Sequence, residues 1–278
     1  MKFTKMHGLG NDYLYINCFE ENLDEVDLAK LAVKMSDRHF GVGSDGIVLI
    51  MPSKESDARM RIFNPDGSEA QMCGNAIRCV ARYLYESGIV KKERMAVETE
   101  SGIKTIDLNV KGPVFSAKVN MGEPILDASQ IPTSFSGEKV IDELIYVDGK
   151  EVKITCVSMG NPHCIVFVED VEFDDFKRLG RALENHKMFP ERINVEFVKP
   201  IDKSHIRMRV WERGAGETLA CGTGACASAV ACVLNDKSDR NVTVHLNGGD
   251  LKIKWSSEDN CVYMEGPAEF VFRGEWII

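Results

Sequence analysis

The chain has 278 residues, of which 44% are hydrophobic and 28% are charged, and its formal net charge is −9. This composition is typical of a globular protein with one large domain or two smaller ones. The acidic balance, with no long basic run, argues against binding to nucleic acids or anionic membranes. No segment approaches the roughly 18 apolar residues of a membrane span, and the N-terminus lacks the apolar stretch of a signal peptide, so we expect a cytoplasmic protein.

Apolar runs predict the elements of the first half of the chain. Strands are expected at 13–17, 46–50, 58–63, 95–99, 103–110 and 114–121, and helices at 23–36 and 76–87. Gly88 follows the second helix, where a glycine commonly forms the C-cap. The next segment, 122–149, contains several Pro, Ser and Gly residues and is expected to cross between the two halves.

The second half shows a similar order of elements. Strands are expected at 152–157, 164–168, 193–198, 206–211, 242–246, 251–255 and 261–264, and helices at 173–184 and 225–234. The last segment, 268–278, is predicted to form one or two strands that return to the first domain.

Short motifs recur in the two halves in the same order, at an offset of about 148 positions. The pairs are Cys73-Gly74 with Cys221-Gly222, Arg61-Ile62-Phe63 with Arg209-Val210-Trp211, Gly10-Asn11 with Gly160-Asn161, and Met121-Gly122 with Glu265-Gly266. Several ordered matches indicate a duplication, and the period is far too long for a solenoid. We therefore expect two similar domains, 1–120 plus 267–278 and 121–266, related by pseudo-two-fold symmetry, with the active site in the cleft between them.

Nine cysteines, in a chain without a secretion signal, are expected to be reduced thiols. Seven lie in strand-like or helical runs, where cysteine is commonly a small buried hydrophobe. These are Cys18, Cys79, Cys156, Cys164, Cys226, Cys232 and Cys261. Cys73 and Cys221 differ, because each stands directly before a helix and is followed by glycine. The cysteine spacings do not match zinc motifs, so no metal site is expected.

A cysteine at a helix N-terminus lies beside free N–H groups and the positive end of the helix dipole, which lowers a thiol pKa and favours anions. A carboxylate held on Gly74-Asn75 and on Gly222-Thr223 would place its α-carbon between two sulfurs. A thiolate on one face and a thiol on the other would then permit removal and return of the α-proton with inversion. No cofactor is expected, since Gly41-Val42-Gly43 lacks the remainder of a dinucleotide motif and no lysine has a recognisable pyridoxal-phosphate context.

Other polar residues at strand ends are further candidates. Asn11, Asn64, Asn161 and Asn194 stand at such positions, where asparagine usually serves turn or cap chemistry. His163 is a candidate to tune a neighbouring thiol, although a single histidine is more often structural. Glu212-Arg213 precedes a glycine-rich loop and suits either a surface ion pair or a zwitterionic ligand.

Along nearly its whole length the sequence resembles the diaminopimelate epimerase family. The matching segments are Met6-His7-Gly8-Leu9-Gly10-Asn11-Asp12, Phe63-Asn64-Pro65-Asp66-Gly67-Ser68-Glu69, Met72-Cys73-Gly74-Asn75, Ser158-Met159-Gly160-Asn161-Pro162-His163, Arg192-Ile193-Asn194-Val195, Trp211-Glu212-Arg213-Gly214-Ala215-Gly216-Glu217-Thr218 and Ala220-Cys221-Gly222-Thr223-Gly224. The resemblance implies a cofactor-independent epimerase that interconverts L,L- and meso-diaminopimelate, in lysine and peptidoglycan precursor synthesis. It also implies a homodimer and an α/β fold of two similar domains, each a curled mixed sheet around a central helix.

The resemblance further implies roles for individual residues. Cys73 and Cys221 would be the acid/base pair, and His163 would support them. The reacting carboxylate would be held by Gly74, Asn75, Gly222 and Thr223. The distal end of the substrate would be held by Asn64, Asn161, Asn194 and Arg213, with Glu212 near the distal amine and Asn11 lining the site. Gly46 stands where some members carry glutamine, so one distal contact would be absent or replaced.

Three alternatives remain open at this point. A proline or hydroxyproline racemase resembles the same fold and thiol pair, but such enzymes favour histidine where this chain has Asn75. A fold relative that isomerises with a carboxylate would not need both cysteines. An amino-acid-binding protein would not need paired thiols. Which cysteine is the resting thiolate depends on coupled pKa values in the folded protein.

Overall fold

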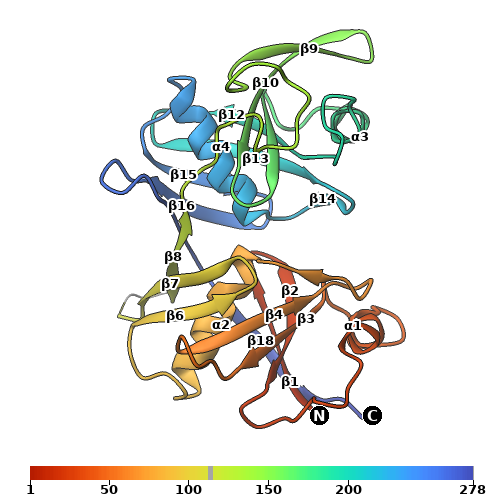
Figure 1. The fold of residues 1–278 in the computed structure, drawn as a ribbon, viewed down its shortest axis with the longest axis vertical. Helices are drawn as coiled ribbons and strands as arrows, with labels where there is room; N and C mark the ends of the chain where they lie inside the picture. Colours follow the sequence, from red (N-terminus) through yellow and green to blue (C-terminus); the bar gives the residue numbers. More distant parts are fainter. Residues whose placement is uncertain (112–114, 278) are drawn as a thin grey trace. The chain divides into compact units, whose positions relative to one another are not determined.

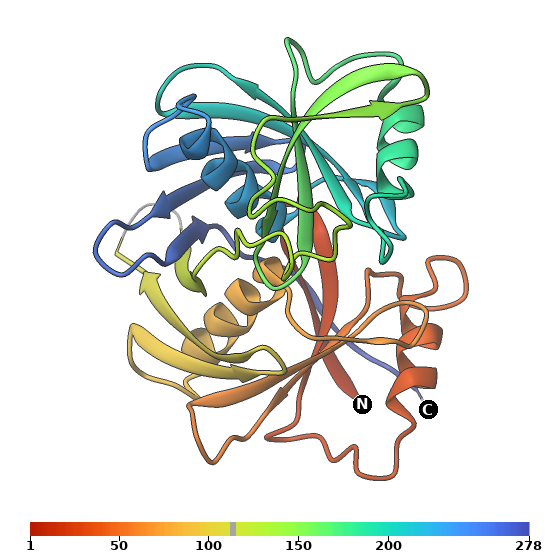
Figure 2. The ribbon, with the colours of Figure 1, turned by 45° about the horizontal axis from the view of Figure 1, so that its top comes forward.

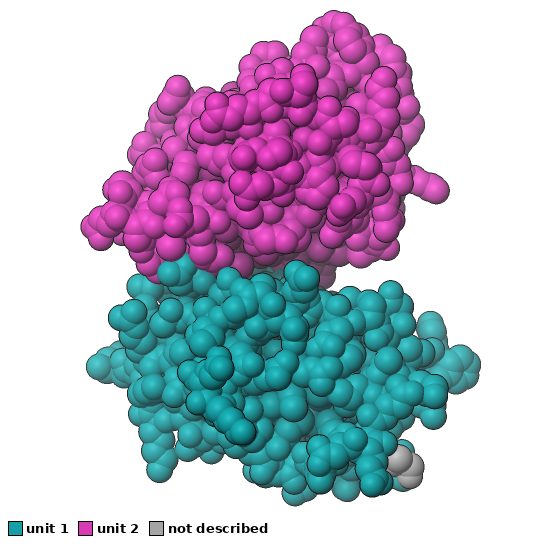
Figure 3. All heavy atoms as spheres, viewed as in Figure 1, with its two compact units in different colours: residues 1–120, 265–278 teal, residues 121–264 magenta. Residues whose placement is uncertain are grey.

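The computed structural model describes residues 1–111 and 115–277 (Figure 1). The chain divides into two compact units, which Figure 3 colours separately. Unit 1 comprises Met1–Asn120 and Glu265–Ile278, and unit 2 comprises Met121–Met264. Among the described residues, none of the helices is long and apolar enough to cross a membrane.

Unit 1 is built on a mixed sheet. Its strands are β1 (Lys2–Gly8), β2 (Asn11–Asn17), β3 (Ile47–Met51), β4 (Ala58–Phe63), β5 (Glu69–Ala70), β6 (Arg94–Thr99), β7 (Gly102–Asn109), β8 (Ser116–Gly122), which runs on into unit 2, and β18 (Glu269–Glu275). They pair in the order β18-β1-β2-β3-β4-β6-β7-β8, with β5 added to the end of β4. The β2–β3 and β4–β6 pairs are parallel and the others are antiparallel. The helices are α1 (Leu28–Ser36) and α2 (Gly74–Glu86).

Unit 2 repeats this topology. Its strands are β9 (Glu143–Val147), β10 (Lys150–Ser158), β11 (Pro162–Phe167), β12 (Asn194–Pro200), β13 (His205–Glu212), β14 (Gly216–Thr218), β15 (Asn241–Leu246), β16 (Gly249–Trp255) and β17 (Val262–Gly266), which runs on into unit 1. The pairing order is β9-β10-β11-β12-β13-β15-β16, with β14 on β13, and β11–β12 and β13–β15 are the parallel pairs. The helices are α3 (Phe176–Glu184) and α4 (Gly222–Leu234). The strand pairing therefore contains the internal repeat that the motifs predict, and the mixed α/β class is confirmed.

One helix is enclosed in each unit. Helix α2 packs against β1, β2, β6 and β7, and helix α4 packs against β10 to β13, β15 and β16. Both helices have 13 residues. Helix α4 is buried along most of its length because it consists largely of Ala, Gly, Cys and Ser, whose small side chains let strands approach from several sides.

The C-terminal segment returns to unit 1, as predicted. Strand β18 pairs with β1 in antiparallel register from Lys2 opposite Glu275 to His7 opposite Glu269. The amino group of Met1 donates to the carbonyl of Trp276 at 3.0 Å, and Figure 2 shows the two ends of the chain side by side. The C-terminal strand therefore covers what would otherwise be an open edge of the sheet.

Several boundaries differ from those that the sequence predicts. The segment 122–149 includes strand β9, which pairs with β10, and β1 was not predicted as a strand. Helix α1 begins five residues later than expected because Asp27 caps it, accepting from the N–H of Lys30 at 3.1 Å. Gly88 follows α2 with a φ of +75°, as expected for a glycine that ends a helix. The predicted start of one strand, Val114, lies outside the described residues.

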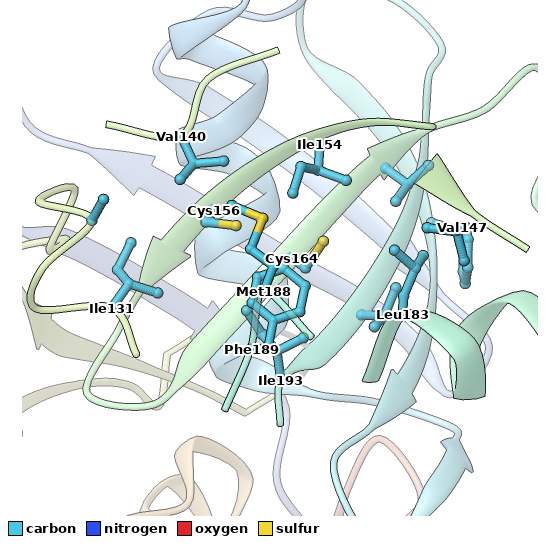
Figure 4. Packing of buried hydrophobic residues seen from close by; sticks show 14 of the residues in the cluster. Ile131, Val140, Val147, Ile154, Cys156, Cys164, Leu183, Met188, Phe189 and Ile193 are labelled. Carbon is cyan, nitrogen blue, oxygen red and sulfur yellow. The ribbon is translucent and has the colours of Figure 1, made fainter. Parts of the chain in front are cut away.

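The apolar core of unit 2 contains two of the cysteines that were predicted to pack. Figure 4 shows Cys156 and Cys164 among branched and aromatic side chains, and both are buried. In the same cluster Phe176 and Phe197 meet edge to face, with ring centroids 5.3 Å apart. Cys18 and Cys261 are instead partly exposed, because Cys18 lies just after β2 and Cys261 lies just before β17.

We expect Phe197→Ala to lower the free energy of unfolding by about 3–5 kcal/mol, because the change leaves a cavity beside aromatic partners. Urea unfolding followed by fluorescence would measure it. Phe40→Ala is the control, since Phe40 is 92% exposed and its loss should change stability by less than about 0.5 kcal/mol. Equal effects of the two changes would contradict the assignment of this core.

Candidate active site

Cys73 and Cys221 occupy the same structural position in their units: each is the N-cap of the enclosed helix. The N–H of Ala76 points at Cys73 Sγ at 3.5 Å, and the N–H of Gly224 points at Cys221 Sγ at 3.4 Å. Both cysteines have extended backbone, as N-cap residues do. Each sulfur therefore lies at the positive end of a helix, an environment that favours a thiolate and attracts anions.

In unit 1 the sulfur lies within an amide network. The thiol of Cys73 donates to Asn11 Oδ1 at 3.4 Å, and Asn75 Nδ2 donates to the same oxygen at 3.3 Å. The amide of Asn11 is held in this orientation because its Nδ2 donates to Asp45 Oδ2 at 2.8 Å. Three of the predicted site residues, Asn11, Cys73 and Asn75, are thus brought together at the start of α2.

Sequence reasoning missed Arg78, whose guanidinium is fully buried under this network. It donates to Asn75 Oδ1 at 2.8 Å, to the carbonyl of Gly74 at 3.0 Å and to the carbonyl of Pro267 at 3.0 Å. It therefore fixes the Asn75 amide and ties the start of α2 to the returning C-terminal segment. The available signal was an arginine between apolar residues on the buried face of a helix.

Unit 2 builds a corresponding network with different side chains. Asn161 Nδ2 donates to Thr223 Oγ1 at 3.2 Å, as Asn75 and Asn11 interact in unit 1. The Oδ1 of Asn161 faces His163 Nε2 at 3.2 Å. His163 is fully buried, and its other ring nitrogen lies 2.7 Å from Glu196 Oε1. The predicted residues Asn161, His163 and Thr223 therefore meet beside Cys221.

Asn194, Glu212 and Arg213 lie at the neighbouring ends of β12 and β13. Asn194 Nδ2 donates to the carbonyl of Pro162 at 2.8 Å, and Asn194 Oδ1 accepts from the N–H of Arg213 at 2.9 Å. The carboxylate of Glu212 accepts from the Thr218 hydroxyl. Arg213 is exposed, and its guanidinium donates to the backbone carbonyl of Glu191 at 3.1 Å rather than to a carboxylate, so its charge is available to a ligand.

Glu184 is a second residue that sequence reasoning missed. Its Oε2 accepts from Trp211 Nε1 at 2.7 Å, and its Oε1 accepts from the N–H of Gly214 at 2.9 Å. A glutamate near the end of an amphipathic helix is ordinarily exposed, but Glu184 is buried. It fixes the Glu212–Arg213 loop through the residues on either side of it.

Asn64 and Gly46, two positions of unit 1 that the sequence analysis singled out, have local structural roles. Asn64 Nδ2 donates to Ser68 Oγ at 3.0 Å within the turn after β4, which is the turn chemistry expected of asparagine. Gly46 has a φ of +142°, and a β-carbon there would lie 2.2 Å from the carbonyl oxygen of Phe63. This backbone therefore leaves no room for a side chain at Gly46.

Burial raises the pKa of two thiols in unit 2, and nearby charges make the effect different at each. Burial raises the pKa of Cys221 well above its usual range, and the carboxylates of Glu212 and Glu196 raise it further. Desolvation also raises the pKa of Glu212. Burial raises the pKa of Cys232 to about 12, against the lowering effect of the Lys237 ammonium, which is consistent with its predicted packing role.

His163, Glu196 and Cys221 are also the described residues that approach the geometry of a metal site, since one ligand atom from each lies within 4.8 Å of the others. Zinc accepts all three donor types. However, His163 Nδ1 and Glu196 Oε1 already bind each other at 2.7 Å, so an ion would have to replace that hydrogen bond.

Comparison with known proteins gives a family match over most of the chain. A family model described as Diaminopimelate epimerase matches residues 3–126 and 155–271. The Diaminopimelate epimerase of Acetivibrio thermocellus is 56% identical over 276 residues, covering 99% of this chain and 98% of that protein. The Diaminopimelate epimerase of Pelotomaculum thermopropionicum is 56% identical over 277 residues, covering 99% of each.

Solved structures with low sequence identity share the fold. A phenazine biosynthesis protein of the PhzF family from Bacillus anthracis aligns with a TM-score of 0.71 at 20% identity, covering 100% of this chain and 99% of that chain. A hydroxyproline epimerase from Agrobacterium vitis aligns with a TM-score of 0.70 at 15% identity, covering 99% of this chain and 90% of that chain. At these identities the matches establish the fold alone.

We expect Gly46→Ala to be far more destabilising than Gly149→Ala. Both glycines have positive φ, but a β-carbon at Gly149 meets nothing within 4 Å, whereas one at Gly46 meets the Phe63 carbonyl. Backbone strain alone should cost about 1–2 kcal/mol at Gly149, and the added clash should cost roughly 4 kcal/mol or more at Gly46. Thermal unfolding of both variants would measure the difference, and equal melting temperatures would contradict this packing.

Proposed function

Because the chain belongs to the diaminopimelate epimerase family, we propose that it interconverts L,L- and meso-diaminopimelate by exchanging one α-proton. The observation that best supports this reaction is the repeated cap, in which each unit holds one cysteine sulfur at the start of its enclosed helix. Inversion at a carbon needs a base on one face and an acid on the other, and two thiols in different protonation states are such a pair.

In the proposed reaction, the thiolate removes the α-proton, so the C–H bond breaks and an S–H bond forms. The electron pair of the C–H bond moves into the carboxylate, which becomes a doubly charged aci-carboxylate. The opposite thiol then gives its proton to the other face of the α-carbon and becomes the thiolate. The reaction consumes no proton overall, and the two sulfurs exchange protonation states. It requires no cofactor.

We propose that the reacting carboxylate is bound by the helix starts at Gly74-Asn75 and Gly222-Thr223. Free N–H groups and the helix dipole favour negative charge at such positions. Their contribution grows as the carboxylate gains its second charge, so they stabilise the transition state more than the bound substrate. The Asn11 and Arg78 contacts fix the Asn75 amide in unit 1 before any ligand arrives.

Cys221 is proposed to enter the cycle as the thiol, and Cys73 as the thiolate that forms when it loses the proton it donates to Asn11 Oδ1. Burial and two nearby carboxylates disfavour the charged form of Cys221. The first proton therefore moves to Cys73, and Cys221 supplies the second. For the opposite isomer the order is reversed, which requires Cys221 to become a thiolate in one half of the cycle.

The distal end of diaminopimelate carries an amine and a carboxylate, which match Glu212 and Arg213 in charge. We propose that Arg213, Asn64, Asn161 and Asn194 hold that end, with Glu212 near the distal amine. An amino acid without a second charged end would leave these polar groups unpaired, which is costly in a closed site. A homodimer, a cytoplasmic location and a place in lysine and peptidoglycan precursor synthesis belong to the same proposal and rest on the family resemblance.

A proline-type racemase is the second candidate, because a hydroxyproline epimerase shares the fold. The Glu212–Arg213 pair favours diaminopimelate, since proline and hydroxyproline have no second charged end that could bind to it. Incubation with proline and hydroxyproline in the same assay separates the two candidates.

We expect Cys73→Ala and Cys221→Ala each to lower the rate of isomer interconversion by about 10²–10⁴-fold or more, because each removes one of two proton-transfer groups. Chiral chromatography of purified L,L- and meso-diaminopimelate would measure the rates. Cys261→Ala is the matched control, since that partly exposed thiol lies outside the site, and its rate should stay within about two-fold of wild type. Full activity of either site variant would contradict the two-thiol mechanism.

A further inference from the structure

The internal repeat provides a position-by-position comparison of the two units. Leu14 lies opposite Ile47 in the β2–β3 pair, and Cys164 lies opposite Val195 in the matching β11–β12 pair. Counting along the strands from these pairs, Tyr13 corresponds to His163, and Val48 corresponds to Glu196. All four side chains are buried. Unit 2 therefore carries a buried histidine and carboxylate where unit 1 carries a phenol and an apolar side chain.

The helix that faces these strands differs at the matching place. Counting from the cap cysteines, Gly224 of α4 corresponds to Ala76 of α2. A β-carbon at Gly224 would lie 2.5 Å from Glu196 Oε1. The smaller residue on the helix thus makes room for the carboxylate on the strand. The two matching positions are thus held by Val48 and Ala76 in unit 1, and by Glu196 and Gly224 in unit 2.

The fold itself does not require a glutamate at position 196. Unit 1 forms the same strands and a helix of the same length with Val48 in its place. Glu196 is fully buried, and its Oε2 has no hydrogen-bond partner among the described residues. Burying a carboxylate with an unpaired oxygen is unfavourable unless a nearby positive charge compensates.

His163 can supply that charge. Its Nδ1 faces Glu196 Oε1 at 2.7 Å and its Nε2 faces Asn161 Oδ1 at 3.2 Å. The Asn161 amide is oriented with Nδ2 donating to Thr223, so both ring nitrogens face acceptors. A histidine ring between two acceptors is satisfied only when both nitrogens carry protons, which makes it an imidazolium.

We propose that Glu196 is a positioning residue for Cys221, which keeps the ring of His163 protonated and aligned beside the sulfur as the counter-cation of the thiolate. The three ligand atoms lie within 4.8 Å of one another. When Cys221 gives its proton to the substrate, the negative charge left on sulfur meets the imidazolium, and no proton leaves His163. This inference rests on the proposed function, in which Cys221 must pass through its thiolate form.

The other titratable groups near Glu196 and His163 do not include a further counter-cation for the Cys221 thiolate. Glu212 and Cys164 are the further titratable groups that act on this cluster, and neither is a cation. Both carboxylates disfavour a thiolate at Cys221. His163 is therefore the residue of the cluster that can offset them.

The test compares wild type with Glu196→Gln, which keeps the size of the side chain and removes its charge. Two accounts predict opposite shifts in Cys221 reactivity. If Glu196 only repels the thiolate, its removal moves the onset of iodoacetamide alkylation at Cys221 to lower pH. If it keeps His163 charged, its removal moves the onset to higher pH, and we expect this result. Mass spectrometry of the Cys221 peptide separates this thiol from the other eight.

The charge of His163 is measured directly by ¹⁵N resonances of the imidazoles in the full-length protein, assigned through His163→Gln. We expect both ring nitrogens to be protonated at pH 7.5 in wild type and only one in Glu196→Gln. The same charge state in both proteins would overturn the inference. These two readouts need no substrate, so they decide the inference even if wild type fails to epimerise diaminopimelate, a failure that would reject the proposed function instead.

Kinetics complete the test. We expect Glu196→Gln to lower kcat by about 10–100-fold with KM nearly unchanged, because it acts on proton transfer rather than on binding. Glu196→Asp, which keeps the charge, should recover part of that loss. Glu172→Gln, an exposed position in the same unit, is the control for loss of one charge. A wild-type kcat in Glu196→Gln would overturn the inference.

Discussion

The structure depends on the burial of one helix within each sheet. The first N–H groups of a buried helix have no access to water, so a side chain must satisfy them. In both units a cysteine satisfies one of them, with its sulfur 3.4–3.5 Å from a backbone nitrogen of the first turn. The constraint that forms the core therefore also places a thiol where negative charge is stabilised. Capping with serine would satisfy the helix equally well but would provide no group that takes up a proton from carbon at neutral pH.

The repeat supplies two similar thiols, and the departures from the repeat make them different. Cys73 lies beside amides whose orientation is fixed by Asp45 and Arg78. Cys221 lies beside Glu196, His163 and Glu212, which are titratable. The proposed two-base reaction needs one sulfur charged and the other protonated, and identical surroundings would not favour either arrangement. We propose that the buried charges of unit 2 provide that bias while the backbone of the two units stays alike.

Most of the fold could be predicted because the same order of elements occurs in both halves of the sequence. A strand with weak alternation in one half, such as β11, is supported by its counterpart in the other. Strand β9 was missed because the Pro, Ser and Gly residues of segment 122–149 favour an irregular crossing, although its partner β10 is the next strand. Strand β1 was missed because one of its two partners, β18, lies at the other end of the chain. Cys73 and Cys221 were predictable from local pattern, since a cap is a local feature. Arg78, Glu184 and Glu196 were not, because a charged residue in a periodic segment is ordinarily exposed and only tertiary contacts show that these are buried.

The central claim is that two different groups carry the proton on the two faces of the α-carbon. The most direct measurement is the initial reaction of L,L-diaminopimelate in deuterium oxide, with product and remaining substrate analysed separately by mass spectrometry. A two-thiol mechanism predicts that the meso product carries deuterium at the inverted carbon from the first turnovers while the remaining substrate stays unlabelled. Product that retains the original proton at early times would show that one group both removes and returns it, and would contradict the account.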